Sequence, residues 1–456
     1  MEVTRIDKYD FVVCGGGTAG FAAAISAARK GMKVALIERN GVIGGVATAG
    51  AINQLLGGRK LNSSGEHVRV VGGIFDELTD RLICEGNAIE PNTVDLEFNP
   101  FGWYPRMASG ISCDETALKI MFDTMCKEAG VRVYFNTVVV DVDKDTKLNA
   151  ITVFNKDGFV RIEAESFADC TGDADVVHMC KLPYLKGRES DGLMTITSVE
   201  MHVENVDGEE LVKYQNANQS PKFVEIIEQL KQDGKWTFNS DIFVTVQLAE
   251  KDVFLVNVVH QSKIDGTNEA DVSRAIAEGR RECVQLFKVM RAHFPGFSNA
   301  RIRKVADSLG VRETRRIIGR YTVTVEDALS GKRYPDTVAA TTYNFDLPDP
   351  ENRGYDPMLG DVRKPKSERE YVVIRIPYRA FLPQELDNLI VAGRCISVER
   401  GVLGAARVMG PCMMMGQVVG TAAAIANGNF ATVDTEILRE TLWQDGVLNP
   451  DELPFK

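Results

Sequence analysis

Three glycines at the end of an apolar run near the N-terminus are the residues whose types and spacing most clearly suit chemistry. The run Asp10–Cys14 leads into Gly15-Gly16-Gly17-Thr18-Ala19-Gly20, and an alanine-rich segment of helical type follows. In a dinucleotide-binding βαβ unit, Gly15 permits the tight turn, Gly17 lets the backbone approach a pyrophosphate, and Gly20 lets the helix pack on the strand. The pyrophosphate would lie at the positive N-terminus of that helix.

An acidic residue at the end of the next apolar run supports this interpretation. Glu38 follows Lys33–Ile37, where a carboxylate would accept hydrogen bonds from an adenosine ribose. A lone GxGxxG is weak evidence, but strand, glycines, helix, second strand and acid all occur in the required order. The sequence therefore predicts dinucleotide binding and not a glycine-rich turn without chemical meaning.

The residues after Glu38 favour FAD over a nicotinamide dinucleotide. Arg39 and the pair Gly44-Gly45 resemble the continuation found in FAD-binding flavoproteins, where the backbone passes close to the ribityl chain and the flavin ring. A flavoprotein reductase with its own NAD(P)H domain would show a second GxGxxG in mid-chain, and none is visible. We therefore expect FAD as the cofactor and no built-in NAD(P)H domain.

Composition narrows the class of protein. The chain has 456 residues, 44% of them apolar and 26% charged, which is typical of a soluble globular protein with two or three domains. Its net charge of −11 argues against nucleic acid as a partner. No apolar run reaches the length of a membrane span, and no signal-type segment precedes the first strand. Nine scattered cysteines without CxxC and five histidines without HxxxH predict free thiols, a cytoplasmic location and no metal site.

Five segments carry clear expectations for local structure. Gly57–Gly73 is polar and glycine-rich and is expected to be a loop or mobile lid. Arg132–Asp143 has the pattern of one strand, and Asp157-Gly158 that of a hairpin turn. Tyr371–Pro377 is strand-like, and Val408–Ala426 is expected to be a buried apolar helix.

Motifs along the whole chain resemble those of a known family. They are the opening fingerprint, Thr171–Asp173, Gly310–Gly319, Ile376–Arg379, Asn388–Arg394 and Gly404–Gly420. On these motifs the chain resembles the FAD-dependent oxidoreductase family of bacterial and archaeal genomes, a distant relative of fumarate reductase and heterodisulfide reductase flavoproteins. The chain lacks the cysteine cluster of the iron–sulfur relatives, and it has Tyr343–Asp346 where a histidine-containing variant is common, so no role of that histidine is carried over.

The resemblance implies a fold and a domain order. We expect an α/β fold: a Rossmann-like FAD-binding domain of the glutathione reductase and fumarate reductase type with an inserted α+β substrate domain. The expected limits are 1–184 for the first part of the FAD-binding domain (with a loop or lid region at about 57–110), 185–370 for the insert and 371–456 for the second part.

The fingerprint and the resemblance together imply the cofactor-binding residues. They are Gly15, Gly17, Thr18, Ala19, Gly20, Glu38, Arg39, Gly44, Gly45, Val46, Thr48, Val139, Thr171, Gly172, Asp173, Gly393, Arg394, Ala406 and Val408.

Flavin chemistry requires two kinds of group at the reacting centre, a positive charge near the flavin and a base. A positive charge or a helix N-terminus near the flavin N1–O2 edge stabilises the reduced ring. Arg407, in Gly404–Val408 at the expected helix start, suits this role, although it could also bind a substrate carboxylate or form a surface ion pair. A base must take the proton that leaves with the hydride. His260 and Tyr343 are candidates by residue type and His67 a weaker one, but none has a motif behind it.

Substrate anchoring is the third need. Arg312 or Arg315 would clamp an anionic substrate, with Glu313 orienting the arginine. A salt-bridge network that also uses Arg316 and holds the insert onto the FAD-binding domain is the alternative, and it is the favoured interpretation of the cluster as a whole.

These features predict an FAD-dependent dehydrogenase. Hydride would pass between a small polar organic substrate, such as a hydroxy acid, polyol or sugar derivative, and flavin N5. An oxidase or reductase, a flavin-dependent isomerase and a flavin-binding subunit of a larger redox complex stay open as alternatives. So do the electron acceptor and association into a homo-oligomer.

Overall fold

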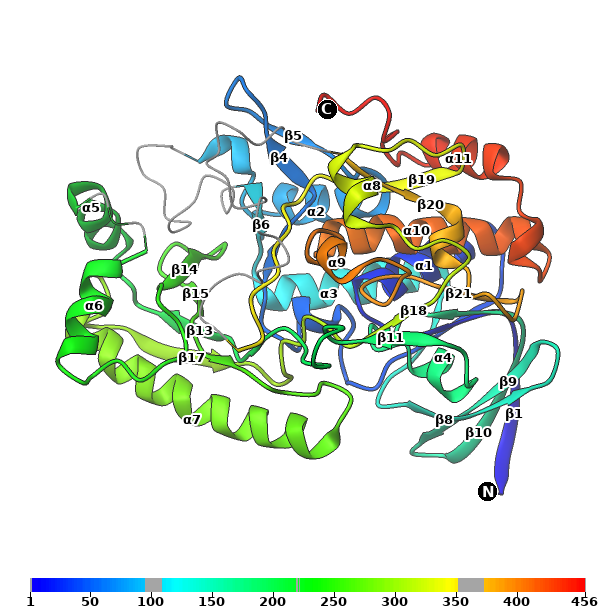
Figure 1. Ribbon diagram of the computed structural model, residues 1–456, viewed down its shortest axis with the longest axis horizontal. Helices are drawn as coiled ribbons and strands as arrows, with labels where there is room; N and C mark the ends of the chain where they lie inside the picture. Colours follow the sequence, from blue (N-terminus) through cyan, green and yellow to red (C-terminus); the bar gives the residue numbers. More distant parts are fainter. Residues whose placement is uncertain (1, 95–108, 219, 221, 352–372, 456) are drawn as a thin grey trace.

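A computed structural model describes residues 2–94, 109–218, 220, 222–351 and 373–455 (Figure 1). The part of the expected lid region at 95–108, with Trp103 and Tyr104, lies outside the described residues. The antiparallel strands of the insert and helix α7 lie at one end of the molecule, and the long strands β1, β8, β9 and β10 lie at the other (Figure 1).

A seven-stranded sheet forms the centre of the first region. Its strands are β1 (Val3–Cys14), β2 (Val34–Ile37), β7 (Arg132–Tyr134), β8 (Val138–Lys144), β9 (Leu148–Asn155), β10 (Gly158–Asp169) and β21 (Leu389–Val391). The order is β7-β2-β1-β10-β9-β8, and β21 also pairs with β10. Strands β7, β2, β1, β10 and β21 are parallel, whereas β9 and β8 are antiparallel. The run Phe11–Cys14 is fully buried, as expected of parallel strands covered on both faces.

Small residues let two helices pack closely beside this sheet. Helix α1 (Thr18–Arg29) lies against α10 (Met409–Ala426), and a Cβ at Gly416 would stand 2.0 Å from the Ala19 carbonyl oxygen. The alanine-rich sequence of α1 is therefore required by packing as well as by helix propensity. Among the described residues, α10 alone is long and apolar enough to cross a membrane, yet 89% of it is buried inside the protein, as in a core helix.

The remaining helices and short strands of the first region lie outside the large sheet. They are β3 (Gln54–Leu55), β4 (Arg59–Leu61), β5 (His67–Arg69), α2 (Gly73–Cys84), β6 (Ile111–Ser112), α3 (Glu115–Ala129), α4 (Asp175–Met179), α9 (Arg400–Ala406) and α11 (Thr435–Gln444). Helix α4 contacts β8 and β10. Helix α3 begins after Asp114, whose side chain accepts from the Ala117 amide, and it ends at Gly130 with φ of 76°, so both of its ends follow the expected capping residues.

The insert has its own antiparallel sheet with helices beside it, which agrees with the α+β class expected of it. Its strands are β13 (Met201–Glu204), β14 (Val244–Gln247), β15 (Phe254–Asn257) and β17 (Arg301–Val305), in the order β14-β15-β13-β17. Its helices are α5 (Gly208–Asn218), α6 (Val224–Gln232) and α7 (Glu269–His293), and β12 (Thr197–Ser198) pairs with β16 (His260–Gln261). Phe223, Phe243 and Phe294 pack ring against ring in its core.

Two ribbons lie where the chain passes between the insert and the first region. Strand β11 (Tyr184–Lys186) pairs with β18 (Arg315–Ile317), and β19 (Thr337–Thr341), which follows α8 (Val325–Leu329), pairs with β20 (Ile374–Pro377). The separate core of the insert runs from Val199 to Leu309 with Ala51 added, whereas residues 317–340 pack into the cores of the first region. The expected domain limits remain predictions, but this packing favours a return of the chain well before residue 370.

Several local expectations need correction. The strand expected at Arg132–Asp143 is two strands, because Asn136 takes a positive φ of 49° and turns the chain from parallel β7 into antiparallel β8. The expected loop Gly57–Gly73 contains the hairpin β4–β5. The strand expected at Tyr371–Pro377 is confirmed over Ile374–Pro377 as β20, which pairs with β19. The hairpin at Asp157-Gly158 is confirmed by the β9–β10 pairing.

Candidate functional site

The glycine loop leaves the N-terminus of α1 open toward a cavity. Gly15 has φ of +101°, and a Cβ there would lie 2.5 Å from the Cys170 carbonyl oxygen. Gly17 is the N-cap of α1 and lines the cavity, and a Cβ at this position would meet no atom within 4 Å. The space that a side chain would fill is therefore available beside unpaired amides at a helix N-terminus, which suits a pyrophosphate.

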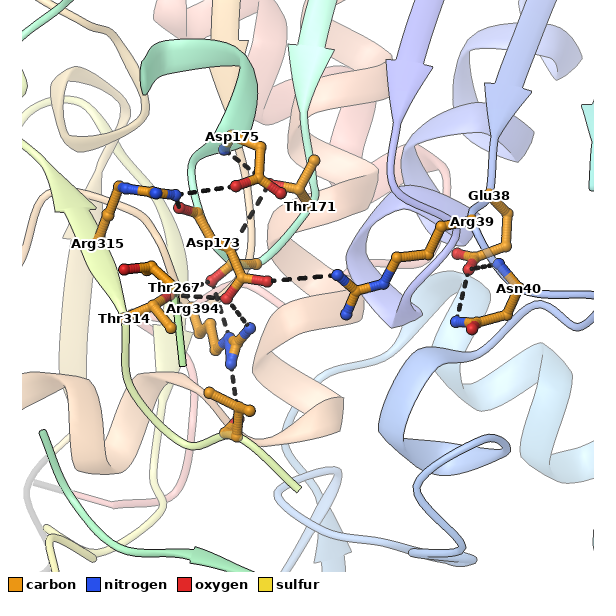
Figure 2. A network of polar contacts seen from close by, with 12 residues as sticks. Glu38, Arg39, Asn40, Thr171, Asp173, Asp175, Thr267, Thr314, Arg315 and Arg394 are labelled. Atoms are coloured by element: carbon orange, nitrogen blue, oxygen red, sulfur yellow. Dashed lines mark hydrogen bonds and ion pairs between the residues drawn. The ribbon is translucent and has the colours of Figure 1, made fainter. Parts of the chain in front are cut away.

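The Glu38 carboxylate lies beside the glycine loop and accepts a hydrogen bond from it (Figure 2). Its Oε2 accepts the Gly16 amide at 2.8 Å, and its Oε1 accepts the amide and the side-chain nitrogen of Asn40 at 2.7 and 2.8 Å. Burial raises the pKa of this carboxyl, and those amides oppose the shift. Oε1 is filled by its two Asn40 donors, whereas Oε2 keeps a second lone pair that suits a ribose hydroxyl.

On the opposite wall of the cavity, Arg394 connects two segments of the chain by hydrogen bonds (Figure 2). Its Nε donates to the Gly172 carbonyl at 2.8 Å and its Nη1 to the Val311 carbonyl at 2.6 Å, while its Nη2 pairs with Asp173. From the other wall, Arg39 extends toward Asp173, with 3.9 Å between Nη1 and Oδ2. Arg394 therefore positions the Thr171–Asp173 turn against a segment of the insert.

The cavity has two sides, which come from different regions of the chain. The dinucleotide side includes Gly15, Gly17, Thr18, Ala19, Glu38, Arg39, Gly44, Gly45, Val46, Val139, Thr171, Gly172, Gly393 and Arg394, and Val408 also lines the cavity. The insert side is formed by Ser198, Asn257, Ser308–Arg312, Tyr343 and Asp346, with Arg407, Met409 and Cys412 beside them.

Four of the expected cofactor residues do not line the cavity. Gly20 lies under Gly15, Thr48 donates to the Ile43 carbonyl, and Ala406 is buried in α9. Asp173 is bound by Arg394 and Thr314. These four support the lining residues from behind and do not face the cavity.

Arg407 faces the cavity but does not begin a helix. It is the C-cap of α9, and Val408 is the N-cap of α10, so the expected helix start is confirmed at Val408, whereas Gly404–Ala406 belong to the end of α9. Its Nη2 donates to the backbone oxygen and to Oδ2 of Asp346 at 3.0 and 3.2 Å. The charge of Arg407 is thus partly compensated within the cavity wall.

The two candidate substrate arginines differ in their surroundings. Arg312 lines the cavity, donates from Nη1 to the Ile196 carbonyl at 3.1 Å, and forms no ion pair with a described residue. Loss of solvent and the nearby charge of Arg407 lower its pKa. Arg315 lies outside the cavity lining and pairs with Asp175 at 2.9 Å. The structure therefore places Arg312, and not Arg315, where a ligand anion would lie.

Glu313 belongs to a buried ion cluster. The carboxylate is 1% exposed, and it binds Arg316 at 2.7 Å, Arg400 at 2.9 Å and the Thr195 amide at 2.9 Å. The cluster links Glu313, just before β18, to Arg400 on α9. A link of this kind is the salt-bridge network that the sequence analysis gives as the alternative.

The candidate bases are separated by the structure. Tyr343 lines the cavity on the insert side. His260 lies behind Asn257, with 2.8 Å between its Nε2 and the Asn257 Oδ1, and burial lowers its pKa to about 3. His67 contacts Ser109 at 2.8 Å on β5, away from the cavity lining. Of the three, only Tyr343 lies where it can contact a ligand directly.

Sequence reasoning missed most of the insert side. Ser198, Asn257 and Asp346 stand at the ends of short strands or in irregular chain, and no spacing links them. Gly310 begins one of the recognised motifs, and that glycine was the available signal.

Comparisons with known sequences and structures give one family match and several structural neighbours. The sequence model of the family described as FAD dependent oxidoreductase matches residues 10–442. A search of curated proteins finds no match. Among solved structures, a geranylgeranyl bacteriochlorophyll reductase-like protein from Thermoplasma acidophilum aligns at 11% identity over 96% of this chain and 92% of its own, with a TM-score of 0.45. A myxobacterial chondrochloren halogenase aligns at 12% over 96% and 78%, with a TM-score of 0.46. A p-nitrophenol 4-monooxygenase from Pseudomonas putida aligns at 12% over 96% and 81%, with a TM-score of 0.41.

Proposed function

Because the chain belongs to the FAD-dependent oxidoreductase family and FAD is its cofactor, we propose that it is a dehydrogenase of small polar substrates that carry a carboxylate. The substrate class proposed is that of hydroxy acids, with polyols and neutral sugar derivatives as poorer candidates. The FAD-binding domain is proposed to be of the glutathione reductase and fumarate reductase type.

The residues of the dinucleotide side suit FAD. The open space at Gly17 beside the α1 N-terminus suits the pyrophosphate, and Glu38 suits the adenosine ribose. Small residues at Gly44–Val46 line the path between them and the insert side. Bound there, FAD supplies the acceptor for a hydride and its two electrons.

The observation that carries the substrate class is the guanidinium of Arg312. It faces the cavity with one carbonyl partner and no carboxylate partner among the described residues. The charges of Glu200 and Asp346 partly offset the loss of solvent at this guanidinium, but neither carboxylate forms an ion pair with it, and a bidentate carboxylate would restore its hydrogen bonds. A ligand anion is therefore the partner that this site lacks.

Arg407 and Tyr343 would complete the substrate site. Arg407 is held by Asp346 at the cavity wall, so its position is fixed before any ligand arrives. Such prior positioning reduces the entropy lost on binding. Tyr343 presents a phenol that can donate to, or accept from, a substrate hydroxyl.

The test is anaerobic reduction of the bound flavin by matched compounds. The visible spectrum of the purified holoprotein is recorded with 2-hydroxy acids, with the corresponding 2-hydroxy amides, and with polyols and sugars. Bleaching by an acid but not by its amide is the expected result, since only the acid offers an anion to Arg312. Equal bleaching by the amide would overturn the role of Arg312, and an unbleached flavin throughout would overturn the dehydrogenase proposal. Oxygen consumption by the reduced protein would identify an oxidase.

A further inference from the structure

A buried carboxyl group lies just behind the insert side of the cavity. Glu200, between β12 and β13, is 0% exposed. Its Oε1 accepts the Ser198 hydroxyl at 2.8 Å, and its Oε2 has no hydrogen-bond partner among the described residues. A buried carboxylate without full hydrogen bonding costs free energy, so a purely structural role does not account for this residue.

Ser198 connects that carboxyl to the cavity. It lines the cavity and is bridged to Gly310, with Ser198 N to Gly310 O at 3.1 Å and Gly310 N to Ser198 O at 2.8 Å. A Cβ at Gly310 would stand 2.7 Å from the Ser198 Oγ. Ser198 is 1% exposed, and a side chain at Gly310 would displace its hydroxyl, so the glycine is needed to keep this hydroxyl in place at the cavity wall.

Two further groups face Glu200. Arg312 favours its charged form, but burial dominates and raises the pKa of Glu200 to about 7. The Cys283 thiol on α7 also lies near, and burial raises its pKa to about 12, so it is neutral beside Glu200. Glu200 therefore exchanges its proton near neutral pH, which suits an acid–base group.

We propose that Glu200 and Ser198 form a proton relay that accepts the hydroxyl proton of the substrate. The proposal rests on the proposed function, because it needs a substrate whose hydroxyl carbon is oxidised. Glu200 acts through Ser198, and Ser198 is the member of the pair that contacts the cavity.

The relay balances. The substrate O–H bond breaks and its proton joins the Ser198 Oγ, while the Ser198 proton passes along the 2.8 Å hydrogen bond to the Glu200 Oε1. FAD held by the dinucleotide side would supply the acceptor for the hydride of the hydroxyl carbon and its two electrons, which would leave the substrate as a carbonyl compound. Ser198 ends as it began, and Glu200 ends protonated.

Substrate binding would also prepare Glu200 for this step. The charge of Arg312 stabilises the Glu200 carboxylate. A substrate carboxylate on Arg312 compensates that charge and so raises the affinity of Glu200 for a proton. The same anion that is recognised by Arg312 thus makes Glu200 a stronger base.

The kinetic test uses two variants and one control. The rate of flavin reduction by the substrate acid is measured against pH in Glu200→Gln, Ser198→Ala and Glu204→Gln, the last being a glutamate further along β13 and half-buried outside the cavity lining. In the native protein at saturating substrate the rate should rise with pH as Glu200 loses its proton, with a midpoint above the pKa of about 7 that Glu200 has without ligand, because the bound carboxylate compensates the charge of Arg312. We expect a loss of about 100-fold in Glu200→Gln and Ser198→Ala, without that rise in the first, and no change in Glu204→Gln.

A second measurement needs no turnover. Infrared difference spectra of the holoprotein between low and high pH should show a protonated carboxyl band that disappears in Glu200→Gln and is retained in Ser198→Ala and Glu204→Gln. A band unaltered in Glu200→Gln, or a Glu200→Gln variant with the native rate and pH profile, would overturn the relay. A native protein that shows the band but is reduced by no compound would overturn the proposed function and with it the transfer of a substrate proton, and the two failures are thereby distinguished.

Discussion

The dinucleotide side and the insert side of the same cavity are built in opposite ways. On the dinucleotide side, the space for the pyrophosphate is formed by backbone close to one strand–helix turn, with Gly15 and Gly17 within three residues of each other, and distant segments add only the wall at Thr171–Gly172 and Gly393–Arg394. On the insert side, Ser198, Asn257 and Arg312 are brought together from positions more than fifty residues apart. Local backbone geometry specifies the first side, and long-range packing of side chains specifies the second.

This difference has a physical consequence for recognition. A pyrophosphate is bound by amides whose direction follows from helix geometry, so any sequence that makes the turn makes the site. A substrate is bound by side chains whose positions depend on the whole insert, so the same fold can present different groups there. The variants below test whether the two sides respond independently.

The largest effect is expected where the two regions are joined. Glu313→Gln removes the carboxylate from the buried cluster with Arg316 and Arg400. Loss of one member of a buried ion cluster leaves uncompensated charge and should lower the free energy of unfolding by about 3–5 kcal/mol. Denaturant unfolding measures this. Glu209→Gln, in an exposed pair with Lys251, serves as the control and should change stability by less than about 0.5 kcal/mol. Equal stability of the two variants would show that the cluster does not join the regions.

The next effect should separate cofactor binding from folding. In Gly17→Val, the new side chain meets no protein atom within 4 Å of its Cβ, so the fold should persist while the pyrophosphate space is filled. Overpacking of this kind should weaken FAD binding roughly 100-fold. Titration of the apoprotein with FAD, followed by flavin fluorescence, gives the affinity. Gly208→Ala in α5 is the control, and native affinity in Gly17→Val would contradict this placement of the pyrophosphate.

A smaller effect should be confined to the insert side. Arg312→Met should raise KM for the substrate acid about 30-fold, because a charge-assisted hydrogen bond is lost, and it should leave FAD affinity unchanged. Arg315→Met is matched to it, since Arg315 pairs with Asp175 outside the cavity lining, and its KM should stay native. A raised KM in both variants would show that the structure separates these arginines wrongly.

The smallest effect is expected at the cavity rim of the dinucleotide side. The Arg39 side chain is 64% exposed and lies 3.9 Å from Asp173, so water screens the pair. Arg39→Ala should weaken FAD binding by no more than about fivefold, and added salt should reduce even that difference. Isothermal titration at two salt concentrations would decide, and a larger or salt-independent loss would make Arg39 a principal cofactor ligand.

The sequence could predict much of the dinucleotide side of the cavity, because that side depends largely on residues close together in the chain. The glycine loop, Glu38 and the helix caps at Asp114 and Gly130 each follow from neighbouring residues. The division of Arg132–Asp143 into two strands could not be seen, since it depends on a positive φ at Asn136 in a run that is otherwise suited to a strand. The strand-forming residues on either side of Asn136 do not indicate whether each strand pairs in parallel or antiparallel.

On the insert side, residue type alone was a poor guide. His260 was chosen because histidine is the usual base, but it is covered by Asn257. Glu200 had no motif and was overlooked, since a glutamate between two strands is ordinary until its surroundings are known. Arg312 and Arg315 are equivalent in the sequence and differ only because the extended chain at β18 turns them to different surroundings.

The Arg394 contacts have a consequence for how the protein is made. Its guanidinium joins the carbonyls of Gly172 and Val311, and α10 covers α1 only once the residues up to Ala426 exist. During synthesis from the N-terminus, the glycine loop leaves the ribosome well before its cavity wall at Arg394 and its covering helix α10. The apolar α1 therefore lacks its covering helix until Ala426 has emerged, and a cavity with both walls requires the chain up to that residue.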